Sequence, residues 1–420
     1  MSRTATTQLV RQLIPAILFL VATIPVLAQK GDTAFSVSPP ARELHRRAIV
    51  IDTHDDTTQR LIHEKDFDLG RRHATGHVDI PRMREGGLDA IFFSIWVPVR
   101  YSGPEATKRA LQQIDAVHEA VRRHPNDLVL ATTAEEIRRA HKQGRIAALM
   151  GVEGGHMIND DLGVLRQFAA LGVRYLTLTH TKDTNWADSS GDKAAHNGLT
   201  DFGRSVVREL NRLGVMVDVS HVSDRTFADV LAVTQAPILA SHSSCRAISN
   251  HARNLSDDML RAIAKNGGVV MINFNQSFLS QELLDATRAR QKELRPQYEA
   301  MAKACGDDEA CQIAGFERLE HQFIADGKLP PVRWETIADH IDHVVKVAGI
   351  NHVGLGSDFD GASMPTGMED VSKLPKITEA LLRRGYSPRN IEKILGGNLL
   401  RVMGEVERVS RRLQAATAKP

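Results

Sequence analysis

The stretch that decides the fold is Ala48-Ile-Val-Ile-Asp-Thr-His-Asp-Asp56, a short apolar run that ends in polar side chains. Runs of this kind, rich in Val and Ile, recur along the chain with amphipathic helical stretches between them. They cover residues 49–54, 88–96, 146–153, 173–180, 215–221, 237–242, 268–274 and 353–358. Near-continuous apolar runs between helices are typical of parallel strands that are buried on both faces. The pattern predicts an α/β fold, a (β/α)8 TIM barrel of the metal-dependent hydrolase type, with a doubly wound sheet as the structural alternative.

The connecting segments support this prediction. Residues 201–213 place apolar side chains on one helical face, with Thr200 as the expected N-cap and Gly214 as the stop. Another helix is expected after Asn254, ending at Gly267. The gap between the seventh and eighth strands is too long for an ordinary crossover. We therefore expect a helical insertion at about 275–335, close enough to the barrel mouth to act as a lid.

The composition of the chain excludes some classes of protein. The 420 residues include 53 Lys and Arg against 51 Asp and Glu, a formal net charge of +2. This balance argues against a nucleic-acid partner. The three cysteines are too few for a disulfide scaffold. Cys305 and Cys311 could close a small loop, or all three cysteines could be unpaired.

The first residues predict export. Arg3 and Arg11 precede an apolar run that closes on Val26-Leu-Ala28, the pattern of a secretory signal. The alternative, a transmembrane anchor, would need about 20 apolar residues. We expect cleavage near Ala28 and a secreted or periplasmic protein with no stable membrane anchor. The expected organisation is a signal peptide, a linker, one barrel and a short tail, over residues 1–28, 29–41, 42–410 and 411–420.

Polar side chains gather at the C-terminal ends of six predicted strands. They are His54, Asp56, Glu153, His180, His221, His242 and Asp358. In a barrel these ends meet at one face, so the side chains should converge. So many ionisable groups can be buried together only if a cation compensates them. Imidazoles and carboxylates without a thiolate suit Zn²⁺ or a similar ion. Two metals sharing a carboxylate are the expected arrangement, and one metal with structural histidines is the alternative.

The order of the motifs resembles the membrane dipeptidase family, the zinc-dependent M19 peptidases, from about residue 44 to residue 401. The segments that carry the resemblance are Ile51-Asp-Thr-His-Asp-Asp56, Val152-Glu-Gly-Gly155, Arg174-Tyr-Leu-Thr-Leu-Thr-His180, Trp186-Ala-Asp188, Val219-Ser-His221, Ser241-His-Ser-Ser244, Ala252-Arg-Asn254 and Val353-Gly-Leu-Gly-Ser-Asp-Phe-Asp-Gly361. One departure is Asp55, where many relatives carry Asn, and it puts no ligand in doubt.

The resemblance implies two Zn²⁺ per chain. One would be held by His54 and Asp56 and the other by His221 and His242, with Glu153 bridging both. The same resemblance implies catalytic roles for Glu153, His180 and Asp358. Substrate binding is assigned to His180, Arg253 and Asp358, with Arg246 as an alternative to Arg253 for the same task.

The activity implied is hydrolysis of small dipeptides, including L,D-dipeptides, through a hydroxide held between the two metals. A homodimer is compatible with the resemblance. Because a fold does not fix a reaction, another amidohydrolase, such as a deaminase or an enzyme that cleaves lactones or β-lactams, is the alternative. A catalytically dead binding relative is a further one. A decayed site would be expected to lose ligands, whereas all five positions here keep them.

Overall fold

The computed structural model describes residues 35–417. Within this range nine strands pair in parallel, and all except β3 are almost completely buried. Their bounds are β1 Ile51–Asp55, β2 Ala90–Trp96, β3 Leu128–Leu130, β4 Ile146–Glu153, β5 Val173–Thr177, β6 Met216–Asp218, β7 Leu239–Ala240, β8 Val269–Ile272 and β9 Val353–Leu355. All eight predicted strands are present. Burial on both faces explains why each sequence run is apolar without alternation.

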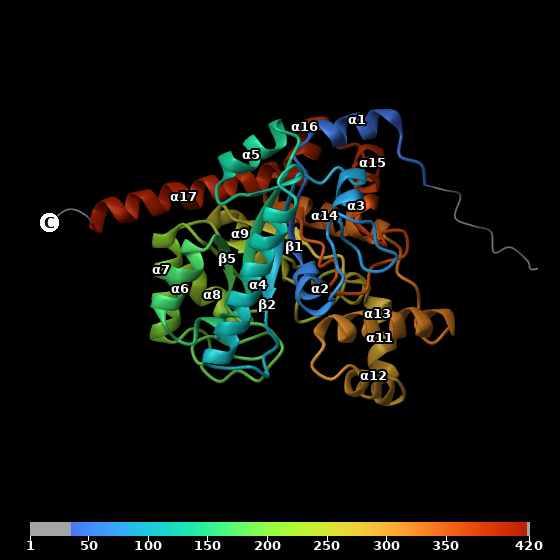
Figure 1. The fold of residues 1–420 in the computed structure, drawn as a ribbon, viewed down its shortest axis with the longest axis horizontal. Coiled ribbons are helices and arrows are strands. Elements are labelled where there is room, and N and C mark those ends of the chain that lie inside the picture. Colours follow the sequence, from blue (N-terminus) through green and yellow to red (C-terminus); the bar gives the residue numbers. More distant parts are fainter. Residues whose placement is uncertain (1–34, 418–420) are drawn as a thin grey trace, which may run out of the picture. The chain divides into compact units, whose positions relative to one another are not determined.

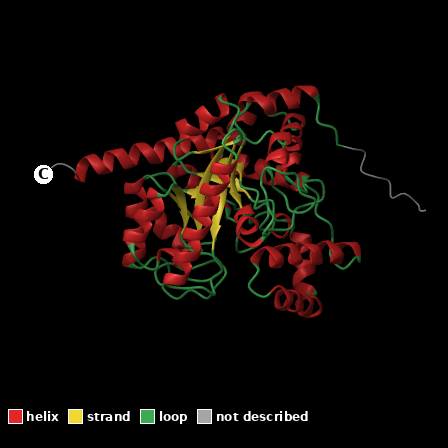
Figure 2. Ribbon diagram, in the orientation of Figure 1, coloured by secondary structure: helices red, strands yellow, loops and turns green. Residues whose placement is uncertain are grey.

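The sheet closes into a barrel. The strands follow the order β2-β1-β9-β8-β7-β6-β5-β4, and β2 also pairs with β4. Strand β3 lies outside this ring and pairs only with the first half of β4, from Leu128 against Ile146 to Leu130 against Ala148. The strands lie at the centre of the ribbon with helices around them (Figure 2). The predicted (β/α)8 barrel is therefore confirmed, with one additional strand.

The helices form the outer layer (Figure 1). Before the insertion they are α1 Pro39–Arg47, α2 Thr57–His63, α3 Ile80–Glu85, α4 Pro104–Arg123, α5 Ala134–Lys142, α6 Leu162–Ala170, α7 Asp201–Leu213, α8 Asp224–Val233 and α9 Asp257–Asn266. After it come α14 Glu335–Ala348, α15 Pro375–Arg383, α16 Pro388–Glu392 and α17 Asn398–Thr417. Single turns of 3-10 or π-helix lie at Gly155–Ile158, Ile350–His352, Val371–Lys373 and Lys393–Gly397. Among residues 35–417, none of the helices combines the length and apolar character needed to cross a membrane.

The predicted helix signals agree with the structure at α7 and α9. The Thr200 side chain accepts from the backbone N–H of Gly203, and Gly214 ends α7 in the left-handed region at φ 75°. Gly267 ends α9 in the same way, at φ 82°. Local capping chemistry therefore fixes both ends of α7 before tertiary packing is considered.

The insertion between β8 and β9 is helical, as predicted. It contains α10 Gln276–Leu279, α11 Gln281–Ala289, α12 Gln291–Cys305 and α13 Glu309–Ala325. The last three lie together in Figure 1, where α12 packs on α11 and α13, and α13 also contacts α2. A disulfide joins Cys305 to Cys311, so the small loop that the sequence allowed is closed, and Cys245 is free and buried.

Three sequence expectations need correction at the level of elements. Strand β3 was not expected, because its three-residue apolar run gives too weak a signal on its own. Helix α1 begins at Pro39, inside the expected linker, because Ser38 caps it. Helix α17 runs through the expected boundary at 410 to Thr417, because its apolar positions continue at helical spacing. The expected signal peptide, residues 1–28, lies outside the described residues.

Candidate metal centre

The predicted site residues come together at the C-terminal mouth of the barrel. A cavity of about 220 Å³ lies there, and every sequence-predicted site residue except His54 lines it directly; His54 is fully buried beside its wall. The lining is Asp56, Trp96, Glu153, His180, Thr181, His221, His242, Arg253, Asn275, Phe278, Ile313, Asp358 and Gly361. The convergence expected from the strand ends is thus present in the structure.

Glu153 lies at the centre of the cluster, and its two carboxylate oxygens face different groups. Oε2 lies 3.4 Å from His54 Nε2, which is 3.6 Å from Asp56 Oδ2. Oε1 lies 2.9 Å from His221 Nε2 and 3.2 Å from His242 Nε2. One carboxylate oxygen of Glu153 therefore faces His54, and the other faces His221 and His242.

The cluster fits metal ions on three counts. Nitrogen and oxygen ligands about 2.0–2.2 Å from a zinc ion lie roughly 3.3–3.6 Å apart in tetrahedral geometry, close to the separations found here. Within the described part of the chain, His54 Nε2 and Asp56 Oδ1 are buried without a hydrogen-bond partner. Donor atoms of His54, Glu153 and His242 also lie within 4.8 Å of one another. A metal between them would satisfy these orphaned polar atoms.

Side chains inside the barrel orient the histidines. The Tyr175 hydroxyl on β5 lies 2.8 Å from His54 Nδ1. His242 Nδ1 lies 2.8 Å from Ser241 Oγ, which donates to Asp218 Oδ2 at 2.6 Å. Because the serine hydroxyl donates to Asp218, it accepts from His242 Nδ1–H. The lone pair of His242 therefore sits on Nε2, which faces Glu153, as a metal ligand requires.

Ionisation in the cluster follows from its contacts. Burial alone would raise the pKa of Glu153, but the nearby charges of His54 and His180, and hydrogen bonds from His221 and His242, lower it well below its usual range. Burial lowers the pKa of His221 and His242 well below the ordinary value. At His54, by contrast, burial is outweighed by Tyr175 and Glu153, which raise the pKa of His54 well above the ordinary value. Neutral His221 and His242 beside a charged Glu153 are in the protonation state that metal binding needs.

Backbone strain is concentrated at two of these positions. His221 and Asp358 both have φ 68°, a left-handed conformation that is uncommon for residues other than glycine. Strain of this type costs on the order of 1–3 kcal/mol and persists where the surroundings enforce it. At both positions it turns the side chain from the strand end toward the pocket.

His180 has the geometry of a donor to substrate. Trp96 Nε1–H donates to His180 Nδ1 at 3.4 Å, so in the neutral ring the proton is on Nε2. Burial lowers the pKa of His180 to about 4, which keeps the ring neutral at pH 7. Its Nε2 lies 3.8 Å from Glu153 Oε1, and His180, Glu153 and His221 together form one of the groups whose donor atoms lie close enough to share a metal ion. The protonated Nε2 suits a hydrogen-bond donor better than a metal ligand.

Arg253 and Arg246 are clearly distinguished by the structure. Arg246 pairs with Asp224 outside the cavity, at 2.7 Å. Arg253 lines the cavity and is buried, and only its Nη2 has a hydrogen-bond acceptor among the described residues, the backbone oxygen of His242 at 3.1 Å. Burial lowers the pKa of Arg253 to about 10, so the guanidinium is still charged at neutral pH. Two buried donor groups, Nε and Nη1, are left for an anion.

Asp358 is held in the site by Asn273. Asn273 donates to its Oδ2 at 2.9 Å, and its Oδ1 lies 4.0 Å from His54 Nε2. Burial raises the pKa of Asp358 to about 6. Asp360, two residues after Asp358, instead accepts from the backbone of His77 and from Thr57, and Asp55 accepts from Thr57. These two carboxylates hold the loops behind the site.

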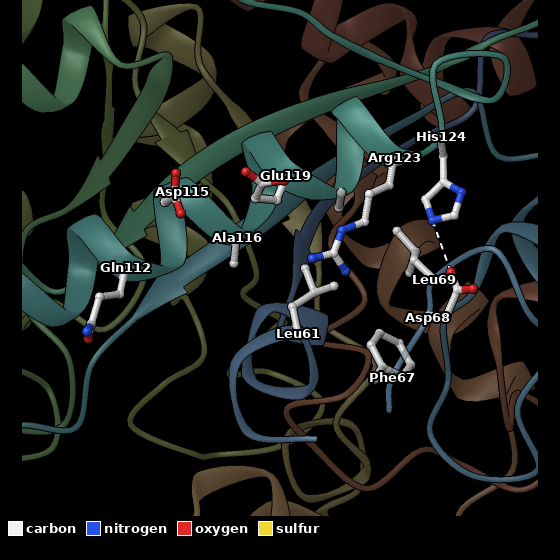
Figure 3. A pocket seen from close by; sticks show the side chains of 11 residues that line it. Leu61, Phe67, Asp68, Leu69, Gln112, Asp115, Ala116, Glu119, Arg123 and His124 are labelled. Carbon is white, nitrogen blue, oxygen red and sulfur yellow. Dashed lines mark ion pairs between the residues drawn. The ribbon is translucent and has the colours of Figure 1, made fainter. Parts of the chain in front are cut away.

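Another hollow, of about 210 Å³, lies between α2 and α4 and contains none of the predicted site residues in its described lining (Figure 3). Asp68 and His124 form an ion pair there at 3.1 Å. Of its charged lining, Asp115 and Arg123 are exposed, and Asp68 and Glu119 are half-buried. The hollow offers no converging set of ligands, so the barrel mouth is the candidate site.

Sequence reasoning missed the residues that support the cluster. Tyr175 is an apolar-run residue in the sequence, and its hydroxyl reaches His54 only because β5 lies across the barrel interior. Asp52 accepts from the backbone of His54 and Ser357, and Asp218 from that of Ser220 and Ser241. The sequence does contain a signal for Asp52 and Asp218, because each of them precedes a predicted ligand histidine by two or three positions. Ile313 and Phe278, which also line the pocket, had no such signal.

A closed parallel barrel with a carboxylate and imidazole centre at its C-terminal mouth defines a metallohydrolase of the TIM-barrel class. The family model for membrane dipeptidases, peptidase family M19, matches residues 39–417. The chain belongs to this family and is a metallopeptidase.

Solved structures agree with this assignment. The probable dipeptidase PvdM from Pseudomonas aeruginosa is 29% identical, with a TM-score of 0.75 over 88% of this chain and 98% of that one. Dipeptidase AC, a metallopeptidase of family M19, is also 29% identical, with a TM-score of 0.71 over 86% and 98%. A metallopeptidase from Rhodobacter sphaeroides, bound to a phosphinate mimic of L-Ala-D-Ala, is 28% identical, with a TM-score of 0.71 over 86% and 99%.

Proposed function

We propose that this metallopeptidase binds two zinc ions and hydrolyses dipeptides with a free C-terminal carboxylate, L,D-dipeptides among them. The observation that carries the proposal is Arg253, a buried guanidinium with two unused donor groups in the same cavity as the Glu153 cluster. A buried charge of this kind calls for an anion, and a carboxylate matches the fork of an arginine. The description of the Rhodobacter sphaeroides protein, bound to a dipeptide mimic, supports the substrate class.

The residues of the site can divide the work of hydrolysis. His54 and Asp56 would hold one metal, His221 and His242 the other, and Glu153 would contact both. Bound there, the metals would lower the pKa of water and polarise the peptide carbonyl. His180 Nε2–H would donate to the carbonyl oxygen as negative charge develops on it.

Asp358 would handle the proton. Its Oδ2 is held by Asn273, which leaves Oδ1 to accept a proton on the His54 side and pass it to the leaving amine. Arg253 would fix the C-terminal carboxylate and thereby place the scissile bond beside these groups. Because one end of the substrate is bound and the cavity is only about 220 Å³, longer peptides are excluded.

Paired substrates test this proposal. Ala-Ala, with L or D stereochemistry at the second residue, should be hydrolysed by zinc-loaded protein, whereas the C-terminal amides should show kcat/KM reduced by about 100-fold or more. Arg253→Met should remove this discrimination. Metal analysis should give two zinc per chain. Equal turnover of acid and amide would contradict the Arg253 role, and failure to cleave any dipeptide would contradict the function.

Export is a separate proposal. Residues 1–28 have the pattern of a signal peptide, and the Cys305–Cys311 disulfide suits an oxidising compartment. N-terminal sequencing of protein recovered from a periplasmic fraction should begin near residue 29. An intact Met1 would contradict cleavage.

A further inference from the structure

One wall of the substrate cavity comes from the insertion. Ile313 of α13 is the only residue of α11–α13 in the described lining. It is half-buried, and with Trp96 and Phe278 it supplies the apolar part of the wall. The rest of the lining comes from loops at strand ends. A side chain from so distant a segment can vary without disturbing the metal ligands.

Helix α13 docks on the barrel through one face. Glu309, Ile313, Glu317 and Glu320 are spaced four, four and three residues apart, so they project from the same side of the helix. The three acidic residues of this face all have partners. Arg100, from the loop after β2, pairs with Glu309 at 2.5 Å; His77 pairs with Glu317 at 2.9 Å; and Gln276 donates to Glu320 at 3.0 Å.

These contacts fix the position of Ile313. Glu309 and Glu317 are anchored one turn before and one turn after it, and Glu309 is fully buried in its ion pair. His77 in turn donates from its backbone to Asp360, two residues after Asp358. At the start of α13 the Cys305–Cys311 disulfide ties the helix to α12. A side chain held this firmly forms a fixed boundary for whatever occupies the cavity.

We propose that Ile313 is a specificity-determining residue that contacts a side chain of the dipeptide and limits its size. The inference rests on the proposed function. The cavity, about 220 Å³, is smaller than the roughly 300–1,000 Å³ typical of small-molecule sites, so an isoleucine in its wall removes a meaningful share of the space. Ile313 offers no hydrogen bond, so it favours small apolar side chains over polar ones. In an apolar pocket, two substrates that differ by one methylene group differ in kcat/KM by roughly 10–200-fold.

The test varies the wall and the substrate together. Two dipeptide series, Xaa-Ala and Ala-Xaa with Xaa as Ala, Leu or Phe, are assayed with wild type, Ile313→Ala and Ile313→Phe. In at least one series, Ile313→Ala should raise the Leu/Ala and Phe/Ala ratios of kcat/KM by about 10-fold or more, and Ile313→Phe should lower them. Opposite changes from the two variants separate contact with substrate from general damage to the fold.

Ile324→Ala is the matched control, because Ile324 is a half-buried isoleucine on the same helix that lines a different hollow. It should leave every ratio within twofold of wild type. If both Ile313 variants cleave Ala-Ala but keep the wild-type ratios in both series, the inference is wrong and the dipeptidase proposal stands. If wild type cleaves no dipeptide, the proposed function fails, and the inference fails with it.

Discussion

Glu153 is the residue on which the candidate site depends. It is buried, charged and in contact with three imidazoles from three other strands, so it holds together groups that would otherwise lack compensation. We predict that Glu153→Gln, which keeps the shape but removes the charge, lowers bound metal below one ion per chain and reduces kcat by more than about 100-fold. Metal analysis and turnover of Ala-Ala are the measurements.

The matched control is Glu379→Gln, because Glu379 is also a buried glutamate but pairs with Ser38 and Arg383 on the outer layer. This variant should keep its metal and its activity. Full metal content in Glu153→Gln would remove Glu153 from the set of ligands.

The positions of the candidate metal ligands follow from the sequence, whereas the residues that orient them do not. His54, Glu153, His221 and His242 could be predicted because parallel strands deliver their ends to one face whatever the details of packing. Tyr175 could not, because its contact with His54 depends on which strands face each other across the barrel. The sequence could not decide between Arg253 and Arg246. The turn between them directs Arg253 into the cavity and Arg246 outward to Asp224.

At the scale of elements, His340 joins three parts of the fold. It lies on α14, accepts from the backbone N–H of Cys245 through Nδ1 at 3.0 Å, and donates from Nε2 to the Leu279 carbonyl of α10 at 3.1 Å. In the neutral ring, one nitrogen accepts and the other donates, so both hydrogen bonds are made only by the neutral form. Burial lowers the pKa of His340 to about 4, although the Leu279 carbonyl opposes the shift.

This produces a pH-dependent stability. Above pH 6.5 the ring is neutral in both the folded and the unfolded chain, and its contribution is complete. As the pH falls from about 6.5 to about 4, the unfolded chain binds a proton that the folded chain refuses, so up to about 3 kcal/mol of the free energy of unfolding is lost. We predict that the stability advantage of wild type over His340→Gln shrinks across this window by up to that amount.

Urea unfolding at pH 7, 5.5 and 4.5 measures this advantage. Glutamine can accept from Cys245 and donate to Leu279 but does not titrate, so the comparison isolates the ring from other ionisable groups. A constant difference between the two proteins over these pH values would contradict the role assigned to His340.

Elements with local signals were predictable and those without were not. Helix α7 has an N-cap at Thr200, an apolar face and a glycine stop at Gly214 in its own sequence, so its bounds follow from local chemistry. Strand β3 has three residues and gains its pairing only from β4. The insertion could be predicted as helical, but its docking face could not, because Glu309 and Glu317 look like solvent-facing charges until Arg100 and His77 are placed opposite them.

In the whole barrel, the five candidate metal ligands lie at the C-terminal ends of four of the eight strands, β1, β4, β6 and β7. If each ion binds only the folded chain, its affinity adds directly to the stability of the barrel, by about 4 kcal/mol per ion when the free metal is 1,000 times the dissociation constant. For a chain of this size, two ions correspond to a fall in Tm of roughly 10 °C on chelation. We predict a fall of this order when zinc-loaded protein is treated with EDTA, and recovery when zinc is returned. Glu153→Gln, which should bind less metal, should show a smaller shift. Equal Tm values with and without metal, measured by scanning calorimetry on protein shown to contain zinc, would mean that the cluster is equally stable without the ions and would contradict the need for a compensating cation.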